Sequence, residues 1–199
     1  MYDLKKYLEY KNGYVSLKEL KLNNFHTSTV KKLLDEGIIE KVKPGLYRLS
    51  NISEPKNISL SFLDVSKAVP HSVICLLSAL SYYDLTTFNN PDINIAIQRN
   101  KKIPTGINQP VKVYYFSEKI YNLGIVTIST KYGTIQIYDR EKTLCDIFRY
   151  RDKIGEDITY EALKSYVGSK NTDYFKLREY AKICGVYLII NQSIKAITG

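Results

Sequence analysis

Apolar residues recur at helical spacing in three short stretches of the first forty residues. A first helix is expected from Asp3 to Tyr10. Ser16 is followed three positions later by Glu19, which is the spacing of a capping box, so a second helix is expected to begin near Leu17. A third helix is expected from 27 to 36, because its apolar residues share one face: Val30, Leu33 and Leu34. The N-terminal region is therefore predicted to be largely helical.

A short hairpin is predicted directly after these helices. Gly37 is a typical helix C-terminal residue and should end the third helix. Two strand-like stretches follow, residues 38–39 and 46–49, and Pro44-Gly45 between them favours a turn. Helix, turn, helix and a two-stranded wing form the order of a winged helix-turn-helix, in which the last helix enters the DNA major groove.

This order makes a set of polar side chains candidates for DNA contact. Hydroxyl and lysine side chains near the start of the third helix would reach base edges, and basic residues of the hairpin would reach phosphate. The candidates are Thr27, Ser28, Thr29, Lys31, Lys32, Lys41, Lys43 and Arg48. The alternative is a winged helix that packs against protein, with solvated lysines.

The remaining chain is predicted to form a second, mixed domain. The polar, proline-containing residues 51–57 resemble a linker, which gives domains at 1–53 and 54–199. Alternating or β-branched runs predict strands at 92–98, 111–116, 125–130 and 134–138. Helical patterns cover a stretch after residue 57 that includes Leu60 and Leu63, and residues 71–84, 140–151, 159–167, 173–184 and 186–197. The fold class is therefore α+β, with a winged helix followed by a mixed α/β domain that ends in helices.

The helix expected at 140–151 is rich in alternating charges. Asp139 precedes it and is expected to be its N-cap. Its acidic and basic residues are expected to form mostly solvated ion pairs one helical turn apart, although the start of this helix could also be a functional surface. Three basic residues at its end, Arg149, Arg151 and Lys153, are a possible second basic surface. Alternatively, these charges only favour solubility and the helix dipole.

The charge of the chain agrees with a nucleic-acid partner. The chain of 199 residues has a formal net charge of +9, and such a surface favours anionic partners. Residues 1–53 hold ten basic and six acidic side chains, and the remainder holds nineteen and fourteen. The N-terminal region is therefore more basic per residue, which favours it as the part that faces DNA.

The sequence gives only weak signals for catalysis or metal binding. Its three cysteines are far apart in sequence and its histidines are only two, His26 and His71, so no zinc site is expected. His71 is expected to have a structural role. Asp92 followed by Gln98 and Lys101 faintly resembles a metal-nuclease motif, but the acidic residue before the lysine is missing. We therefore expect no enzyme activity, no metal and no cofactor, in a cytoplasmic protein without a membrane helix.

Three segments resemble the AbiEi family of antitoxins, in the order in which that family has them. The first is Gly45-Leu46-Tyr47-Arg48-Leu49, the second runs from Pro70 to Leu80 with Leu85-Thr86 after it, and the third runs from Gly133 to Asp146. AbiEi proteins are antitoxins of type IV toxin–antitoxin systems that are linked to abortive phage infection.

The resemblance implies a function for each domain. The winged helix would repress the protein's own operon at inverted-repeat DNA, and the C-terminal domain would supply the antitoxin activity. The partner would be a nucleotidyltransferase toxin, opposed without a tight complex. Two alternatives remain: a winged-helix regulator or DNA-associated enzyme with an unrecognised C-terminal active site, and an interaction module that never meets DNA.

Overall fold

In the computed structural model the chain divides into two compact units. The structure describes residues 4–52 and 58–199. The first unit contains residues 1–70 together with two segments from later in the chain, 102–110 and 129–135. The second unit contains residues 71–101, 111–128 and 136–199. Residues 53–57, which make up most of the predicted linker, lie outside the described residues, so the predicted domain bounds stay a prediction.

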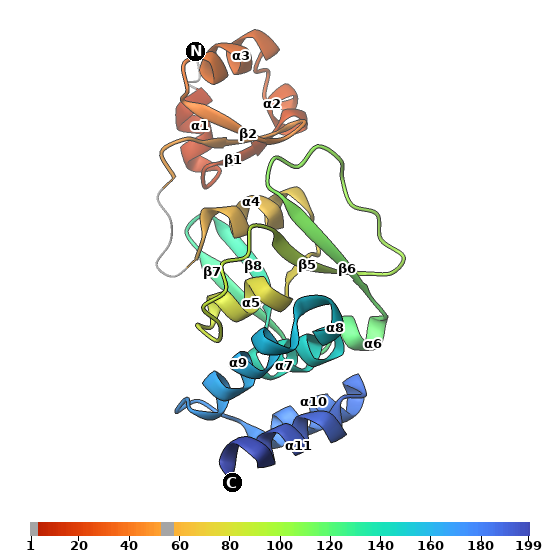
Figure 1. The fold of residues 1–199 in the computed structure, drawn as a ribbon. Coiled ribbons are helices and arrows are strands. Elements are labelled where there is room, and N and C mark those ends of the chain that lie inside the picture. Colours follow the sequence, from red (N-terminus) through yellow and green to blue (C-terminus); the bar gives the residue numbers. More distant parts are fainter. Residues whose placement is uncertain (1–3, 53–57) are drawn as a thin grey trace. The chain divides into compact units, whose positions relative to one another are not determined.

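The described residues of the first unit form short helices and a small sheet (Figure 1). Its elements are α1 (Leu4–Tyr10), β1 (Tyr14–Ser16), α2 (Leu17–Leu22), α3 (Thr27–Asp35), β2 (Ile39–Lys43), β3 (Leu46–Leu49) and α4 (Leu60–Ala68). The sheet is antiparallel in the order β1-β3-β2, with Val15 opposite Tyr47 and Ile39 opposite Leu49. The predicted hairpin is confirmed, but β1 adds a third strand that the sequence pattern did not indicate.

Local signals explain where these elements begin and end. The capping box is formed as predicted: the Ser16 hydroxyl accepts from the Glu19 amide at 3.2 Å, and the Glu19 carboxylate accepts from the Ser16 amide at 2.9 Å. Gly45 adopts a φ of +77° in the turn between β2 and β3, a conformation that glycine takes without a steric cost. The core of this unit is apolar and includes Leu8, Leu20 and Val30.

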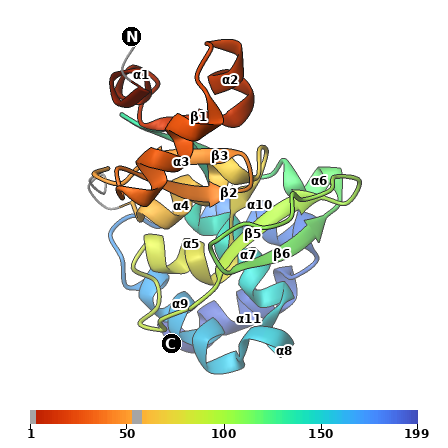
Figure 2. The same cartoon turned by 90° about the horizontal axis from the view of Figure 1, so that it is seen from above.

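The second unit holds most of a five-stranded mixed sheet and the C-terminal helices (Figures 1 and 2). Its elements are β4 (Val73–Ile74), α5 (Leu76–Tyr82), β5 (Ile93–Gln98), β6 (Val111–Phe116), α6 (Glu118–Tyr121), β7 (Ile125–Thr130), β8 (Gly133–Tyr138), α7 (Arg140–Arg149), α8 (Arg151–Ile154), α9 (Glu156–Val167), α10 (Tyr174–Cys184) and α11 (Tyr187–Thr198). The strand order is β6-β5-β4-β8-β7. β4 pairs antiparallel with β5 and parallel with β8, and β5 pairs parallel with β6. The chain is thus α+β, and after β8 it ends in the five helices α7 to α11.

The prediction of one helix over 71–84 is wrong. Val73 and Ile74 form the central strand of the sheet, and only residues 76–82 are helical. A short apolar run without polar residues fits a fully buried strand as well as a buried helix, so its periodicity could not separate the two. The β-branched pair favours a strand once neighbouring strands are available on both sides.

Helix α7 lies at the centre of the second unit and contacts α5, α9, α10 and α11. It packs on the sheet through a shared core of buried side chains: Val73, Ala96, Phe116, Tyr138, Leu144, Phe148, Leu163 and Leu177. The predicted single helix over 140–151 ends at Arg149, and α8 starts separately after Tyr150. The alternation predicted for 92–98 has no exposed side, because Asn94 and Ala96 are as buried as the isoleucines between them.

Candidate functional site

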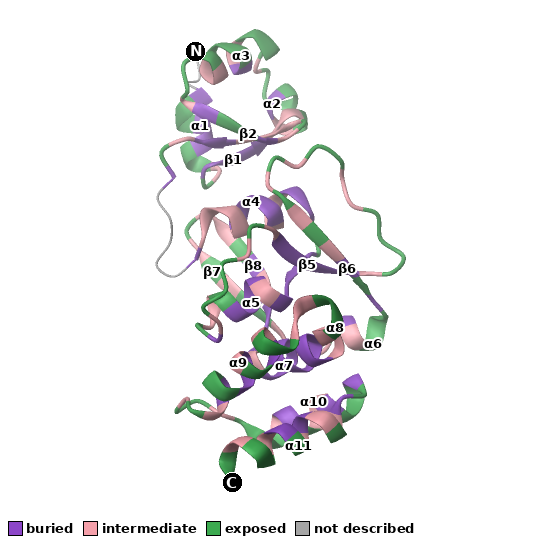
Figure 3. Ribbon diagram, viewed as in Figure 1, coloured by how far each residue is buried: buried purple, intermediate pink, exposed green. Residues whose placement is uncertain are grey.

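The start of α3 carries most of the residues predicted to contact DNA. Thr27, Ser28, Lys31 and Lys32 are exposed and Thr29 is half-buried, while Val30 alone of this helix is buried. Lys32 forms an exposed pair with Glu36 at 3.8 Å, and such a pair holds the lysine only weakly. The polar face of α3 is therefore available to a partner along its length (Figure 3).

The N-cap residue of α3, His26, makes no side-chain capping bond within the described part of the chain. The first amides of a helix lack partners inside the helix, and together with the helix dipole they favour an anion. The first turn of α3 thus combines the backbone amides of a helix N-terminus with the hydroxyls of Thr27 and Ser28.

The three basic residues of the hairpin lie in different environments. Lys41 is exposed on β2. Lys43 is half-buried, and its Nζ donates to the Ala68 carbonyl at the end of α4 at 2.6 Å. Burial lowers the pKa of Lys43, as expected for an ammonium group that leaves water.

Arg48 lies inside the first unit. Its Nη2 is 2.7 Å from Glu40 Oε2, its Nε is 3.2 Å from Asp64 Oδ1, and its Nη1 donates to the Leu49 carbonyl at 3.1 Å. The Tyr14 hydroxyl donates to the same Asp64 carboxylate at 2.7 Å. This arrangement links β3, β2 and α4, and it leaves the Arg48 side chain only 10% exposed. Arg48 therefore belongs to an internal ion pair, and no local sequence signal indicates this because Asp64 lies sixteen residues away.

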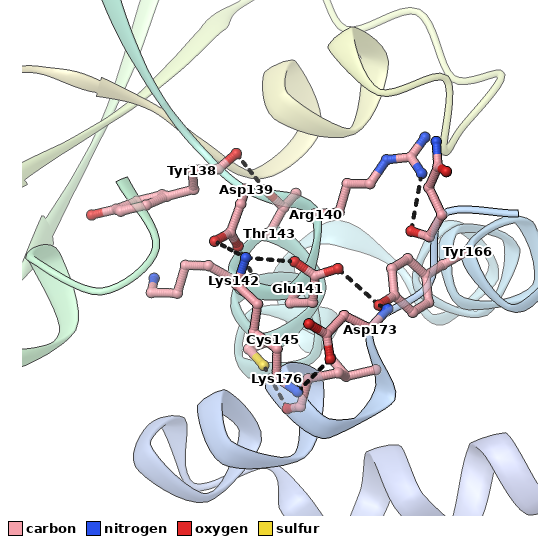
Figure 4. Close-up of polar contacts among 12 residues, drawn as sticks. Tyr138, Asp139, Arg140, Glu141, Lys142, Thr143, Cys145, Tyr166, Asp173 and Lys176 are labelled. Atoms are coloured by element: carbon pink, nitrogen blue, oxygen red, sulfur yellow. Dashed lines mark hydrogen bonds and ion pairs between the residues drawn. The ribbon is translucent and has the colours of Figure 1, made fainter. Parts of the chain in front are cut away.

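A second cluster of charged side chains surrounds α7 (Figure 4). Asp139 is the N-cap, as predicted, and its Oδ1 accepts from the Lys142 amide at 2.8 Å. Lys142 and Asp146 form an ion pair one helical turn apart, and both side chains are completely buried. The Lys142 ammonium also lies 4.0 Å from the centre of the Tyr138 ring and 4.8 Å from that of Phe116. Burial raises the pKa of Asp146, whereas Lys142 and Arg149 act in the opposite direction.

The outer part of this cluster joins α7 to α9 and α10. Lys176 Nζ lies 3.0 Å from Asp139 Oδ2 and 3.3 Å from Glu141 Oε2. The Tyr166 hydroxyl donates to Glu141 Oε1 at 2.8 Å and accepts from the Asp173 amide at 2.7 Å (Figure 4). Burial by itself lowers the pKa of Lys176, but the two carboxylates outweigh that effect and raise it above its ordinary value.

The expectation of mostly solvated ion pairs on this helix is wrong. Eight of the ten residues of α7 are buried, including Glu141, Lys142 and Asp146. The sequence carried no local signal of this burial, because Lys142, Asp146 and Arg149 share one side of the helix and the apolar Leu144, Ile147 and Phe148 share the other, as in a helix with a solvated charged face. These charges are satisfied by one another, which gives the cluster a structural role at the centre of the unit.

The second basic surface proposed from the sequence is mostly engaged in local contacts. Arg149 lies 3.4 Å from Asp146 and stacks 5.5 Å from the Phe116 ring centre. Arg151 donates to the Phe148 carbonyl at 2.9 Å, at the C-terminal end of α7 where cations are favoured. Of the three residues only Lys153 is exposed, and it lies 6.0 Å from the Tyr150 ring centre.

No group of three or more histidine, cysteine, aspartate or glutamate side chains in residues 4–52 and 58–199 is arranged to hold a metal ion. The three cysteines are free and buried. None of the helices in this part of the chain is both long and apolar enough to cross a membrane.

Comparisons with known proteins identify a related fold. No family model matches this chain, and no curated protein matches it in sequence. The crystal structure of the RV2827C protein from Mycobacterium tuberculosis is similar, with a TM-score of 0.53 and 13% sequence identity. The similarity covers 96% of this chain and 79% of that chain. At this identity the likeness concerns the fold alone.

Proposed function

We propose that this protein is a winged-helix repressor that binds the DNA upstream of its own gene and also acts as a type IV antitoxin. The proposal of a winged helix is supported by the order of α2, α3, β2 and β3 and by the capping box that begins α2. In such a module α3 would be the helix that enters the major groove.

The observation that carries the DNA-binding proposal is the exposed polar face of α3. Thr27 and Ser28 lie in its first turn, where their hydroxyls would meet base edges, and Lys31 follows on the next turn. Lys32 and Lys41 would contact phosphate. We assign Lys43 and Arg48 to the support of this surface, because their charged groups are held by Ala68, Glu40 and Asp64.

The antitoxin proposal rests on the resemblance to the AbiEi family. Two of the three matching segments are neighbours in the second unit, since β4 pairs with β8 through Ile74 and Ile137. They build the centre of that unit, including the start of α7 with Asp139 as its N-cap. The second unit would oppose a nucleotidyltransferase toxin without forming a tight complex with it.

The DNA-binding proposal is tested with a double variant on α3. Lys31→Ala/Lys32→Ala should weaken binding to the upstream DNA and lower the slope of log affinity against log salt by roughly one for each lost phosphate contact. The matched control is Lys164→Ala/Lys182→Ala, which removes the same charge from exposed positions on α9 and α10. Binding is measured by fluorescence anisotropy across a salt series. Equal effects of the two double variants would contradict a DNA surface on α3.

The antitoxin activity is tested separately in cells. Full-length protein, the α3 double variant and an empty vector are compared for rescue of cells that express a nucleotidyltransferase encoded beside this gene. Rescue by the α3 variant at wild-type level would support two separable activities. An absence of rescue by the wild-type protein would contradict the antitoxin proposal and leave the DNA-binding proposal standing.

A further inference from the structure

The second unit contains a small cavity at one edge of its sheet. Its volume is about 230 Å³, and the residues that line it are His71, Gln98, Lys101 and Tyr121. These residues come from three places in the sequence: the turn before β4, the end of β5 with the turn after it, and α6.

The topology of the sheet explains why these residues meet. β5 and β6 are parallel, with Gln98 opposite Phe116, so both strands end at the same edge. β4 runs antiparallel to β5 with Val73 opposite Ala96, which brings the residues just before β4 to this edge as well. In sheets with parallel strands, ligands bind outside the carboxyl ends of those strands, because the loops there diverge and leave a crevice.

The cavity wall is held in a fixed and strained conformation. His71 has a φ of +64°, which is costly for a residue with a side chain. The Tyr121 hydroxyl donates to the His71 carbonyl and stabilises this turn. Tyr121 is itself fixed, because its carbonyl accepts from the Tyr138 hydroxyl at 2.8 Å. Next to His71, the buried Ser72 hydroxyl has no hydrogen-bond partner within the described part of the chain.

The chemistry of the lining favours an anion. Lys101 supplies a positive charge, and Gln98 and His71 supply amide and imidazole donors. None of the four described residues that line the cavity has a carboxylate. Ligand pockets for drug-sized molecules measure roughly 300–1,000 Å³, so this smaller cavity fits a compact anion.

We propose that this cavity binds a phosphoryl group. The group would accept from the Lys101 ammonium, the Gln98 amide and the His71 imidazole, beside the hydrogen bond from Tyr121 to the His71 carbonyl. The proposal does not depend on the proposed DNA-binding function, because no lining residue belongs to α3 or to the hairpin.

The test is a calorimetric titration of full-length protein with inorganic phosphate at constant ionic strength. Lys101→Ala should weaken binding by about tenfold or more, since it removes a charge-assisted hydrogen bond. His71→Asn should weaken it by a smaller factor, because asparagine tolerates the left-handed backbone but lacks the imidazole donor. The matched control is Lys112→Ala, which removes one charge at the opposite end of β6 and should leave the affinity unchanged within about twofold.

A parallel titration with nucleoside 5′-monophosphates tests whether the bound phosphoryl group belongs to a nucleotide or is free phosphate. Tighter binding than inorganic phosphate, with the same loss in Lys101→Ala, would support the proposal and identify a nucleotide as the source. Equal binding would support it with free phosphate as the source. The proposal is overturned if neither probe saturates the protein at about 50 mM, or if Lys101→Ala and Lys112→Ala have the same effect.

Discussion

Helices α3 and α7 contain the same charged pattern in opposite environments. Lys31 and Asp35 in α3 have the spacing of Lys142 and Asp146 in α7, four residues apart. Lys31 and Asp35 are both exposed, whereas Lys142 and Asp146 are completely buried and form an ion pair. The comparison shows that spacing determines which charges can meet along a helix, while the neighbouring elements determine how much the pair matters. An exposed pair contributes little, and a buried pair becomes costly to break.

The largest expected effect is the loss of one partner from the buried pair. Asp146→Ala should lower the free energy of unfolding by about 3–5 kcal/mol, because it leaves the Lys142 charge buried without its carboxylate. Asp35→Ala removes the equivalent residue of α3 and should change stability by less than about 0.5 kcal/mol. Chemical denaturation of both variants measures the difference. Equal changes would mean that the two environments do not differ as the structure indicates.

Removing both partners should reverse most of that loss. The free energy of unfolding of Lys142→Met/Asp146→Leu should lie within about 2 kcal/mol of the wild-type value, because apolar side chains of similar volume need no compensating charge. A double-mutant cycle of wild type, the two single variants and the double variant should give a coupling energy of several kcal/mol between Lys142 and Asp146. The same cycle with Lys31→Met and Asp35→Leu should give about 0.5 kcal/mol or less. A double variant as unstable as Asp146→Ala alone would show that packing, and not the unpaired charge, causes the loss.

The smallest expected effect is a pH dependence that Lys176 contributes. The pKa of Lys176 is raised above its ordinary value of 10.5 by Asp139 and Glu141, which outweigh burial. A cation with a raised pKa stabilises the folded state fully below pH 10.5, and this contribution is lost as the pH rises through the folded value.

The corresponding measurement compares Lys176→Gln with wild type between pH 8 and pH 12. The stability difference between them should be constant below about pH 10 and shrink above it. Lys31→Gln on α3 is the control and should show a smaller difference at every pH. A difference for Lys176→Gln that grows with pH would contradict the sign of the shift.

Much of the fold could be predicted because its signals are local. The capping box of Ser16 and Glu19 is satisfied within four residues, so the start of α2 did not depend on the rest of the chain. The strands at 111–116 and 125–130 and the last helix were predicted within a few residues for the same reason. The Asp139 N-cap is likewise a contact between near neighbours.

The sequence did not reveal several features that depend on contacts between distant residues. Val73 and Ile74 are a strand because β5 and β8 pair with them on both sides. Arg48 is internal because α4 brings Asp64 to it, and the cavity residues His71, Lys101 and Tyr121 meet only through the strand order.

The sequence by itself determined most of the element types, the N-caps Ser16 and Asp139 and the excess of positive charge, since each follows from residues close together or from composition. It also determined which charges on α7 could pair. Only the tertiary structure decided which of these charges are buried. Burial depends on elements that are far away in the chain. The free-energy cost of removing water from a charged group is much larger than the energy that an exposed ion pair along a helix contributes.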